Sequence, residues 1–121
     1  LRAKISKAEI VDQPCRNTTV WRKSSMIKHI VMFKLAEKNE ANMNQAVTAL
    51  NSLRGNIETL KHIEIGTDYL GSERSYDIVL TSHFDNQEGL TTYATHKNHL
   101  PVVKIMRSLC ASSIVVDYET E

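Results

Sequence analysis

One ten-residue segment limits the possible folds of this chain more than any other. Residues Met26–Leu35 (MIKHIVMFKL) are rich in β-branched and apolar side chains, as is typical of a β-strand. Apolar side chains occupy both alternating sets of positions, with Ile27, Val31 and Phe33 in one set and Met26, Ile30 and Met32 in the other. A strand with two apolar faces is normally covered on both. The helices of a small domain account for one face, so we expect a partner on the other.

The segments that follow alternate between helical and strand patterns. Apolar residues at helical spacing predict a helix over Glu40–Arg54, with Asn39 as its N-cap. Alternating and β-branched residues predict strands over Lys61–Asp68 and Tyr76–Phe84, joined by a turn-rich loop. The first half of the domain therefore has the order strand, helix, strand, strand.

A second helical region precedes a closing strand. Asp85, with Glu88 three residues later, has the pattern of a capping box and predicts a helix over 86–95. Leu100–Leu109 predicts a further helical segment, and Ser113–Tyr118 predicts the last strand. The order β-α-β-β-α-β is the ferredoxin-like α+β pattern with an antiparallel sheet. Because its helices cover one sheet face, we expect two subunits to pair their other faces into a dimeric α+β barrel.

Length and composition narrow the classes of function. A chain of 121 residues has room for one domain, and a formal net charge of +1 offers no large basic surface for nucleic acid. No apolar run approaches the roughly 20 residues that cross a bilayer, so we expect no membrane partner. Cys15 and Cys110 form neither a CxxC pattern nor a disulfide framework, and a cytoplasmic location is expected.

The first 25 residues differ from the rest of the chain. They show no sustained strand or helix period, contain Pro14 and end in a polar run. They also lack the apolar segment of about 7–15 residues that a secretory signal requires. We expect residues 1–25 to be a leader or an expression-derived extension, and residues 26–119 to form the domain.

Four segments in order carry a resemblance to a known family. They are residues 26–34, the third-strand residues 76–80 with Phe84-Asp85, the histidine-containing segment 93–103, and the closing residues 116–118. Together they resemble the stress-responsive α/β-barrel (Dabb) family, over nearly all of residues 26–119. The resemblance implies a homodimer whose two sheets form one barrel.

The resemblance also implies candidate site residues. A plant polyketide cyclase of this family performs an intramolecular aldol condensation with a Tyr–His pair, in a pocket between sheet and helices. Motif matching places that pair on Tyr93 and His99 and a supporting histidine on His29, whereas a further histidine of the cyclase is matched by Ile78. If the protein is an enzyme, cofactor-free acid–base chemistry of the cyclase or lyase type is implied.

Each candidate also has a structural explanation. His99 titrates near neutral pH and could act as a general base, but a histidine at a helix end also bonds to backbone. The Tyr93 hydroxyl could orient a carbonyl, although a helix tyrosine is often a core residue. His29 either lines a pocket or is a hydrogen-bonded core group. Asp117 and Glu119 are expected to be solvated or to pair across a dimer interface.

Metal and nucleotide chemistry lack support in the sequence. His96 and His99 are three residues apart, but a third ligand is not evident and Lys97 between them would repel a cation. The four glycines form no phosphate-binding loop. We expect neither a metal nor a cofactor.

Three hypotheses about function follow. The leading one is a stress-associated homodimer that binds a small apolar or aromatic ligand between sheet and helices, without an established reaction. The residues assigned to that site are His29, Ile78, Tyr93 and His99. The alternatives are a cyclase-like enzyme with catalytic Tyr93 and His99, and a structural or chaperone-like dimer with a filled core.

Overall fold

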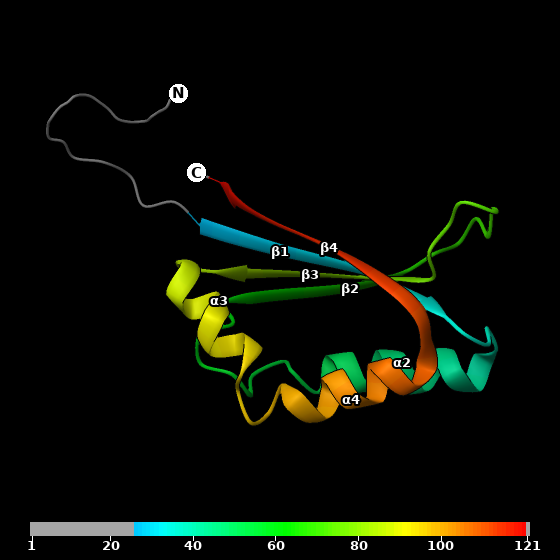
Figure 1. The fold of residues 1–121 in the computed structure, drawn as a ribbon, viewed down its shortest axis with the longest axis horizontal. Coiled ribbons are helices and arrows are strands. Elements are labelled where there is room, and N and C mark those ends of the chain that lie inside the picture. Colours follow the sequence, from blue (N-terminus) through cyan, green and yellow to red (C-terminus); the bar gives the residue numbers. More distant parts are fainter. Residues whose placement is uncertain (1–25, 121) are drawn as a thin grey trace, which may run out of the picture.

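A computed structural model describes residues 26–120, which form a four-stranded antiparallel sheet with the helices packed below it in Figure 1. The strands are β1 (Met26–Leu35), β2 (His62–Thr67), β3 (Ile78–Phe84) and β4 (Cys110–Thr120), in the order β2-β3-β1-β4. The helices are α2 (Glu40–Asn51), α3 (Gln87–Ala94) and α4 (Leu100–Leu109). This is the predicted ferredoxin-like α+β fold. The expected leader and Cys15 lie outside the described residues.

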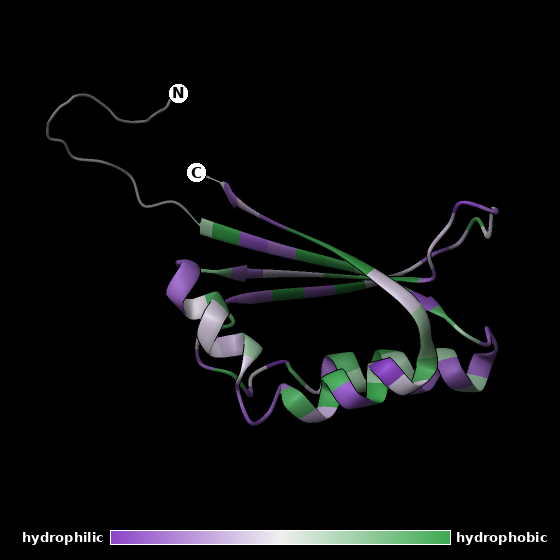
Figure 2. Ribbon diagram, in the orientation of Figure 1, coloured by the Kyte–Doolittle hydropathy of each residue, from purple (hydrophilic) through white to green (hydrophobic). Residues whose placement is uncertain are grey.

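The two faces of β1 have the environments that its sequence predicts. Ile27, Phe33 and Leu35 are buried against the helices, whereas Met26 and Met32 on the opposite face are exposed. β1 is a central strand that pairs with β3 on one side and β4 on the other. Hydrophobic residues lie along the strands as well as on the helices (Figure 2). The helices therefore cover only one of the two apolar faces of β1.

The outward face of the sheet carries a continuous apolar area. In the β1–β4 register Met32 lies opposite Ile114 and Ile30 lies opposite Val116, so these side chains share the outward face. Met32 is 39% exposed and Val116 is 51% exposed. Exposed apolar residues that adjoin one another in this way mark an interaction surface.

The helix boundaries differ in detail from the predicted ones. Asn39 caps α2 as predicted, because its side chain accepts a hydrogen bond from the Asn42 amide at 2.8 Å. The N-cap of α3 is Asn86, which accepts from the Gly89 amide, so the assignment to Asp85 was wrong by one residue. Asp85 lies outside the helix and faces Lys61 instead, with 3.9 Å between carboxylate and ammonium.

Several elements are shorter or longer than predicted. α2 ends at Asn51, and residues 52–54 continue in tight turns before Gly55, whose φ of 78° suits a residue without a side chain. β3 begins at Ile78, two residues later than predicted. β4 begins at Cys110 and directly follows α4, so it is longer than the predicted strand Ser113–Tyr118.

In the stretch from Met26 to Thr120, no helix is long and apolar enough to span a bilayer.

Asp77 holds the strand ends beside α4 in place. The residue is 5% exposed; its carboxylate accepts a 2.8 Å hydrogen bond from the Leu35 amide, while its own amide donates to the Phe33 carbonyl. Lys38 lies 3.4 Å from the same carboxylate. These contacts fix the end of β1, and the Ala36 amide then donates to the Leu109 carbonyl at the end of α4. The position of α4 over the sheet depends on this junction.

Candidate functional site

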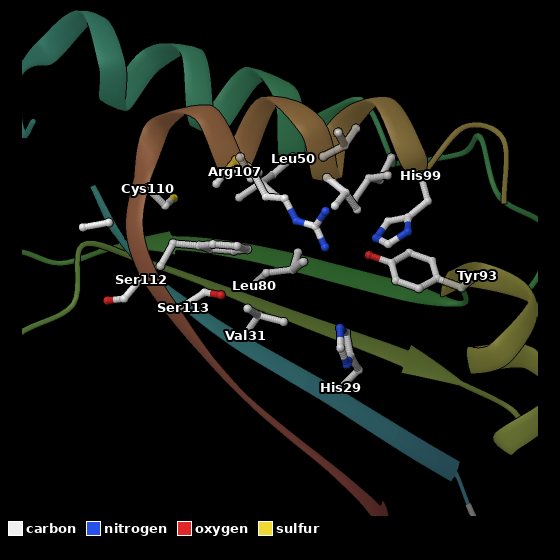
Figure 3. A pocket seen from close by; sticks show the side chains of 16 residues that line it. His29, Val31, Leu50, Leu80, Tyr93, His99, Arg107, Cys110, Ser112 and Ser113 are labelled. Atoms are coloured by element: carbon white, nitrogen blue, oxygen red, sulfur yellow. The ribbon is translucent and has the colours of Figure 1, made fainter. Parts of the chain in front are cut away.

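A cavity of about 390 Å³ lies between the sheet and α4 (Figure 3). Its apolar lining consists of Val31, Phe33, Leu50, Leu53, Leu80, Val102, Val103, Met106 and Ala111. Its polar lining consists of His29, Tyr93, His99, Arg107, Cys110, Ser112 and Ser113. The core is therefore not packed solid between the helices and the sheet.

α4 presents one face to this cavity. His99, Val103 and Arg107 follow one another at four-residue spacing, which places their side chains along one side of the helix. Pro101 stands in the first turn, where its missing amide hydrogen is not needed. His99 occupies the N-cap position without capping the helix through its side chain, so its ring is available to the cavity.

Tyr93 on α3 is the most deeply placed polar residue of the site. It is 1% exposed, and its ring centroid lies 4.2 Å from that of His99 and 5.9 Å from that of His29. Figure 3 shows its hydroxyl turned toward the cavity beside the His99 ring. Burial raises the pKa of Tyr93 to about 12, so the phenol stays protonated and can donate a hydrogen bond.

His99 has the complementary properties. Burial lowers the pKa of its imidazole, outweighing a hydrogen bond to the Ala94 carbonyl that acts in the opposite direction. The two atoms of that bond, His99 Nδ1 and the Ala94 oxygen, are 3.1 Å apart, and because a carbonyl only accepts, Nδ1 carries the proton. In the neutral ring Nε2 then holds a lone pair. Tyr93 and His99 thus place a proton donor beside a proton acceptor.

His29 is oriented by a residue whose pairing differs from expectation. Its Nδ1 contacts the Asp117 carboxylate, and the two residues are direct partners in the β1–β4 register. Asp117 was expected to be solvated or to pair across a dimer interface; its side chain is 44% exposed, and it also pairs with His29 within the subunit. The structure therefore brings His29, Tyr93 and His99 together and adds Asp117 behind His29.

Two other predicted positions have different surroundings. Ile78 is 1% exposed on β3 and does not line this cavity. His96 accepts a hydrogen bond from the Asn98 amide at Nδ1, so its Nε2–H faces Glu58 at 3.2 Å. That arrangement ties the loop before α4 to the loop after α2. Within residues 26–120 no three His, Cys, Asp or Glu side chains are grouped to hold a metal ion.

Arg107 is a cavity residue that the sequence interpretation missed. Figure 3 shows its side chain extending from the last turn of α4 into the cavity, toward the end that holds Tyr93 and His99. Arg107 comes eight residues after His99, which is two steps of the four-residue helical spacing, and this spacing could have identified it from the sequence.

The fold and the cavity together define a ferredoxin-like α+β domain with a ligand-sized space between sheet and helices. Residues 27–120 match the Stress responsive A/B Barrel Domain (Dabb), and the chain belongs to this family. It is similar to the stress-response A/B barrel domain-containing protein DABB1 of Arabidopsis thaliana, with 29% identity over 81% of this chain. The matched region covers 49% of that relative, so the chain spans about half of its length.

Solved structures share the same fold. A dimeric protein of unknown function and ferredoxin-like fold from Bacteroides fragilis is 35% identical, with a TM-score of 0.69, covering 78% of this chain and 96% of that one. A hydroxynitrile lyase from Passiflora edulis has a TM-score of 0.71 over 82% of this chain and 96% of its own. At 17% identity, the lyase shows the fold alone.

Proposed function

We propose that this chain is a homodimeric Dabb protein that binds a small apolar or aromatic ligand in the cavity between its sheet and α4. The cavity itself carries the proposal, because its volume of about 390 Å³ is in the range of small-ligand sites. The polar groups of the lining include the Tyr93 hydroxyl and His99 Nε2, which lie beside apolar walls. Among the described residues neither group has a hydrogen-bonding partner, so both are available to a ligand.

The homodimer is supported by the outward face of the sheet. Met32, Ile114 and Val116 are exposed there on adjacent strands, and a second sheet would remove them from water. The similar protein from Bacteroides fragilis is dimeric. We place this dimer in the cytoplasm, because Cys110 has no disulfide partner among residues 26–120 and the spacing of the two cysteines fits no disulfide framework.

A fluorescent apolar probe tests ligand binding. N-phenyl-1-naphthylamine is neutral and aromatic, and its fluorescence rises when it leaves water, so titration gives its dissociation constant. Val103→Phe places a larger side chain in the cavity lining and is expected to weaken binding by about tenfold or more. Val47→Phe makes the same change at a half-buried helix position outside that lining. Equal affinities for both variants, or no binding by the wild type, would contradict the proposal.

A second candidate function is acid–base catalysis by Tyr93 and His99. The specific observation is the protonated phenol beside an imidazole whose Nε2 is a proton acceptor. The lyase from Passiflora edulis supports only that this fold accommodates an enzyme. General acid–base catalysis contributes about 10²–10⁴-fold to a rate, so loss of one partner should be easily measured.

The enzyme hypothesis is tested with a linear polyketide thioester, followed by chromatography of cyclised products. Tyr93→Phe and His99→Ala should each lower turnover by about 10²-fold or more if the pair is catalytic. Unchanged turnover in His99→Ala would exclude it. A filled-core structural dimer, the remaining alternative, has no role for the cavity and predicts no specific binding of the naphthylamine probe.

A further inference from the structure

Arg107 places a permanent positive charge in a cavity that is otherwise mainly apolar. Its guanidinium extends into the cavity from the last turn of α4 (Figure 3). Arginine remains protonated at every physiological pH, and its planar group presents several hydrogen-bond donors. Within residues 26–120 it makes neither an ion pair nor a side-chain hydrogen bond.

Among residues 26–120, no carboxylate pairs with the Arg107 guanidinium. No Asp or Glu is present among the residues that line the cavity. Asp117, behind His29, is already engaged by that imidazole. Asp77, which is outside the cavity lining, accepts from the Leu35 amide and lies beside Lys38. Arg107 is exposed, so water reaches its guanidinium, and the carboxylate of a ligand in the cavity could replace that water without displacing a protein partner.

We infer that the ligand is an amphipathic organic acid whose carboxylate binds the Arg107 guanidinium and whose apolar or aromatic body lies against the sheet. This inference rests on the proposed function, because it requires the cavity to be a ligand site. A carboxylate matches the guanidinium with two parallel hydrogen bonds. One permanent cation balances one negative charge, so a singly charged acid fits better than a phosphate ester with two.

The neighbouring groups fit the same ligand class. Figure 3 shows the guanidinium directed toward the end of the cavity where Tyr93 and His99 lie. Tyr93 is a neutral donor, and burial holds the pKa of His99 low, so neither brings a charge that competes for the carboxylate. Val31 and Leu80 line the sheet side and provide an apolar surface for the ligand body. A cationic ligand would instead be repelled by Arg107.

The test compares two competitors with the same naphthyl body, one of which carries a carboxylate and the other a neutral amide of similar shape. Bound N-phenyl-1-naphthylamine is displaced by 1-naphthylacetate, a carboxylate, or by 1-naphthylacetamide, its neutral amide. The wild type is expected to bind the acid about tenfold or more tightly than the amide, as is typical of a charge-assisted hydrogen bond. Arg107→Gln should remove this preference, with the amide changing by less than about threefold. Lys104→Gln removes a positive charge from an exposed position of α4 outside the cavity lining and should keep the preference.

The outcomes separate this inference from the proposed function. If the naphthylamine does not bind the wild type, the cavity is not a ligand site and the proposed function fails first. If it binds but the acid and the amide displace it equally, the ligand site stands and the carboxylate assignment is overturned. Equal weakening of both competitors by Arg107→Gln would show that Arg107 only supports packing. An equal loss of preference in Lys104→Gln would assign the effect to overall charge.

Discussion

His29 on β1 and Asp117 on β4 face each other across two paired strands, and the imidazole Nδ1 contacts the carboxylate Oδ1. A carboxylate only accepts hydrogen bonds, so Nδ1 of His29 is the donor. The ring is thereby held in one orientation, with its centroid 5.9 Å from that of Tyr93. Asp117 therefore acts on the site by positioning His29, and the two strands of the sheet determine that position.

Removal of Asp117 should release the His29 ring. In Asp117→Ala, long-range ¹H–¹⁵N spectra are expected to show His29 exchanging between tautomers, whereas the wild type shows one form with the proton on Nδ1. The pair is partly exposed, so the free energy of unfolding should fall by less than about 1 kcal/mol. Glu119→Ala is the matched control, since Glu119 lies two residues along β4 and points to the same side. Identical His29 spectra in the two variants would contradict the positioning role.

The half-buried imidazole of His99 should make folding sensitive to acid. Because burial lowers its pKa in the folded state, the unfolded chain binds the extra proton first as the pH falls. The stabilisation is complete above the unfolded value of about 6.5 and is lost progressively below it. The pKa of His83 is also lowered, chiefly by desolvation, and acts in the same direction.

Urea unfolding at pH 7.5 and pH 5.5, at one protein concentration, measures this effect. The wild type should unfold at a lower urea concentration at pH 5.5. His99→Gln removes the titrating group and should show a smaller difference between the two pH values. Equal pH dependence in wild type and variant would assign the acid sensitivity to other residues.

The architecture was predictable from the sequence because its evidence is local. The two apolar sets of Met26–Leu35, the helical spacing in α2 and the Asn39 cap are all features of neighbouring residues. The cap of α3 was assigned wrongly because Asp85 and Asn86 are both good capping residues. Only the backbone decides between them, and the extended φ of −161° belongs to Asn86.

The site was predictable only in part. Tyr93 and His99 are close in the chain, and motif resemblance indicated both. Asp117 lies 88 residues from His29, and their contact depends on a strand register that no local pattern specifies. The place of Arg107 in the cavity lining can be predicted from the helical periodicity of α4, provided that His99 is assumed to face the cavity. Ile78 was assigned by motif matching alone, and its buried side chain does not line that cavity.

Asp77 should be important for stability. Asp77→Ala removes the carboxylate that accepts from the Leu35 amide and leaves that amide unpaired in a buried position. The free energy of unfolding is expected to fall by about 2–3 kcal/mol, the usual effect for a buried hydrogen bond to a charged group. Lys38→Ala removes a half-exposed lysine 3.4 Å from the carboxylate but keeps the hydrogen bond from the Leu35 amide, and should cost less than Asp77→Ala. Similar urea midpoints for the two variants would contradict this assignment.

The outward sheet face should control the oligomeric state. Met32 lies on a central strand opposite Ile114 and Val79, so Met32→Lys would place an unpaired charge in the middle of the proposed dimer interface. An uncompensated buried charge costs about 3–5 kcal/mol. A cost of this size corresponds to at least a hundredfold rise in the dimer dissociation constant. Sedimentation equilibrium at micromolar concentration measures that constant. Leu70→Lys, which makes the same kind of change at a more exposed apolar residue in a loop, should leave the dimer intact. A monomeric wild type would refute the dimer, and a stable Met32→Lys dimer would show that another surface forms it.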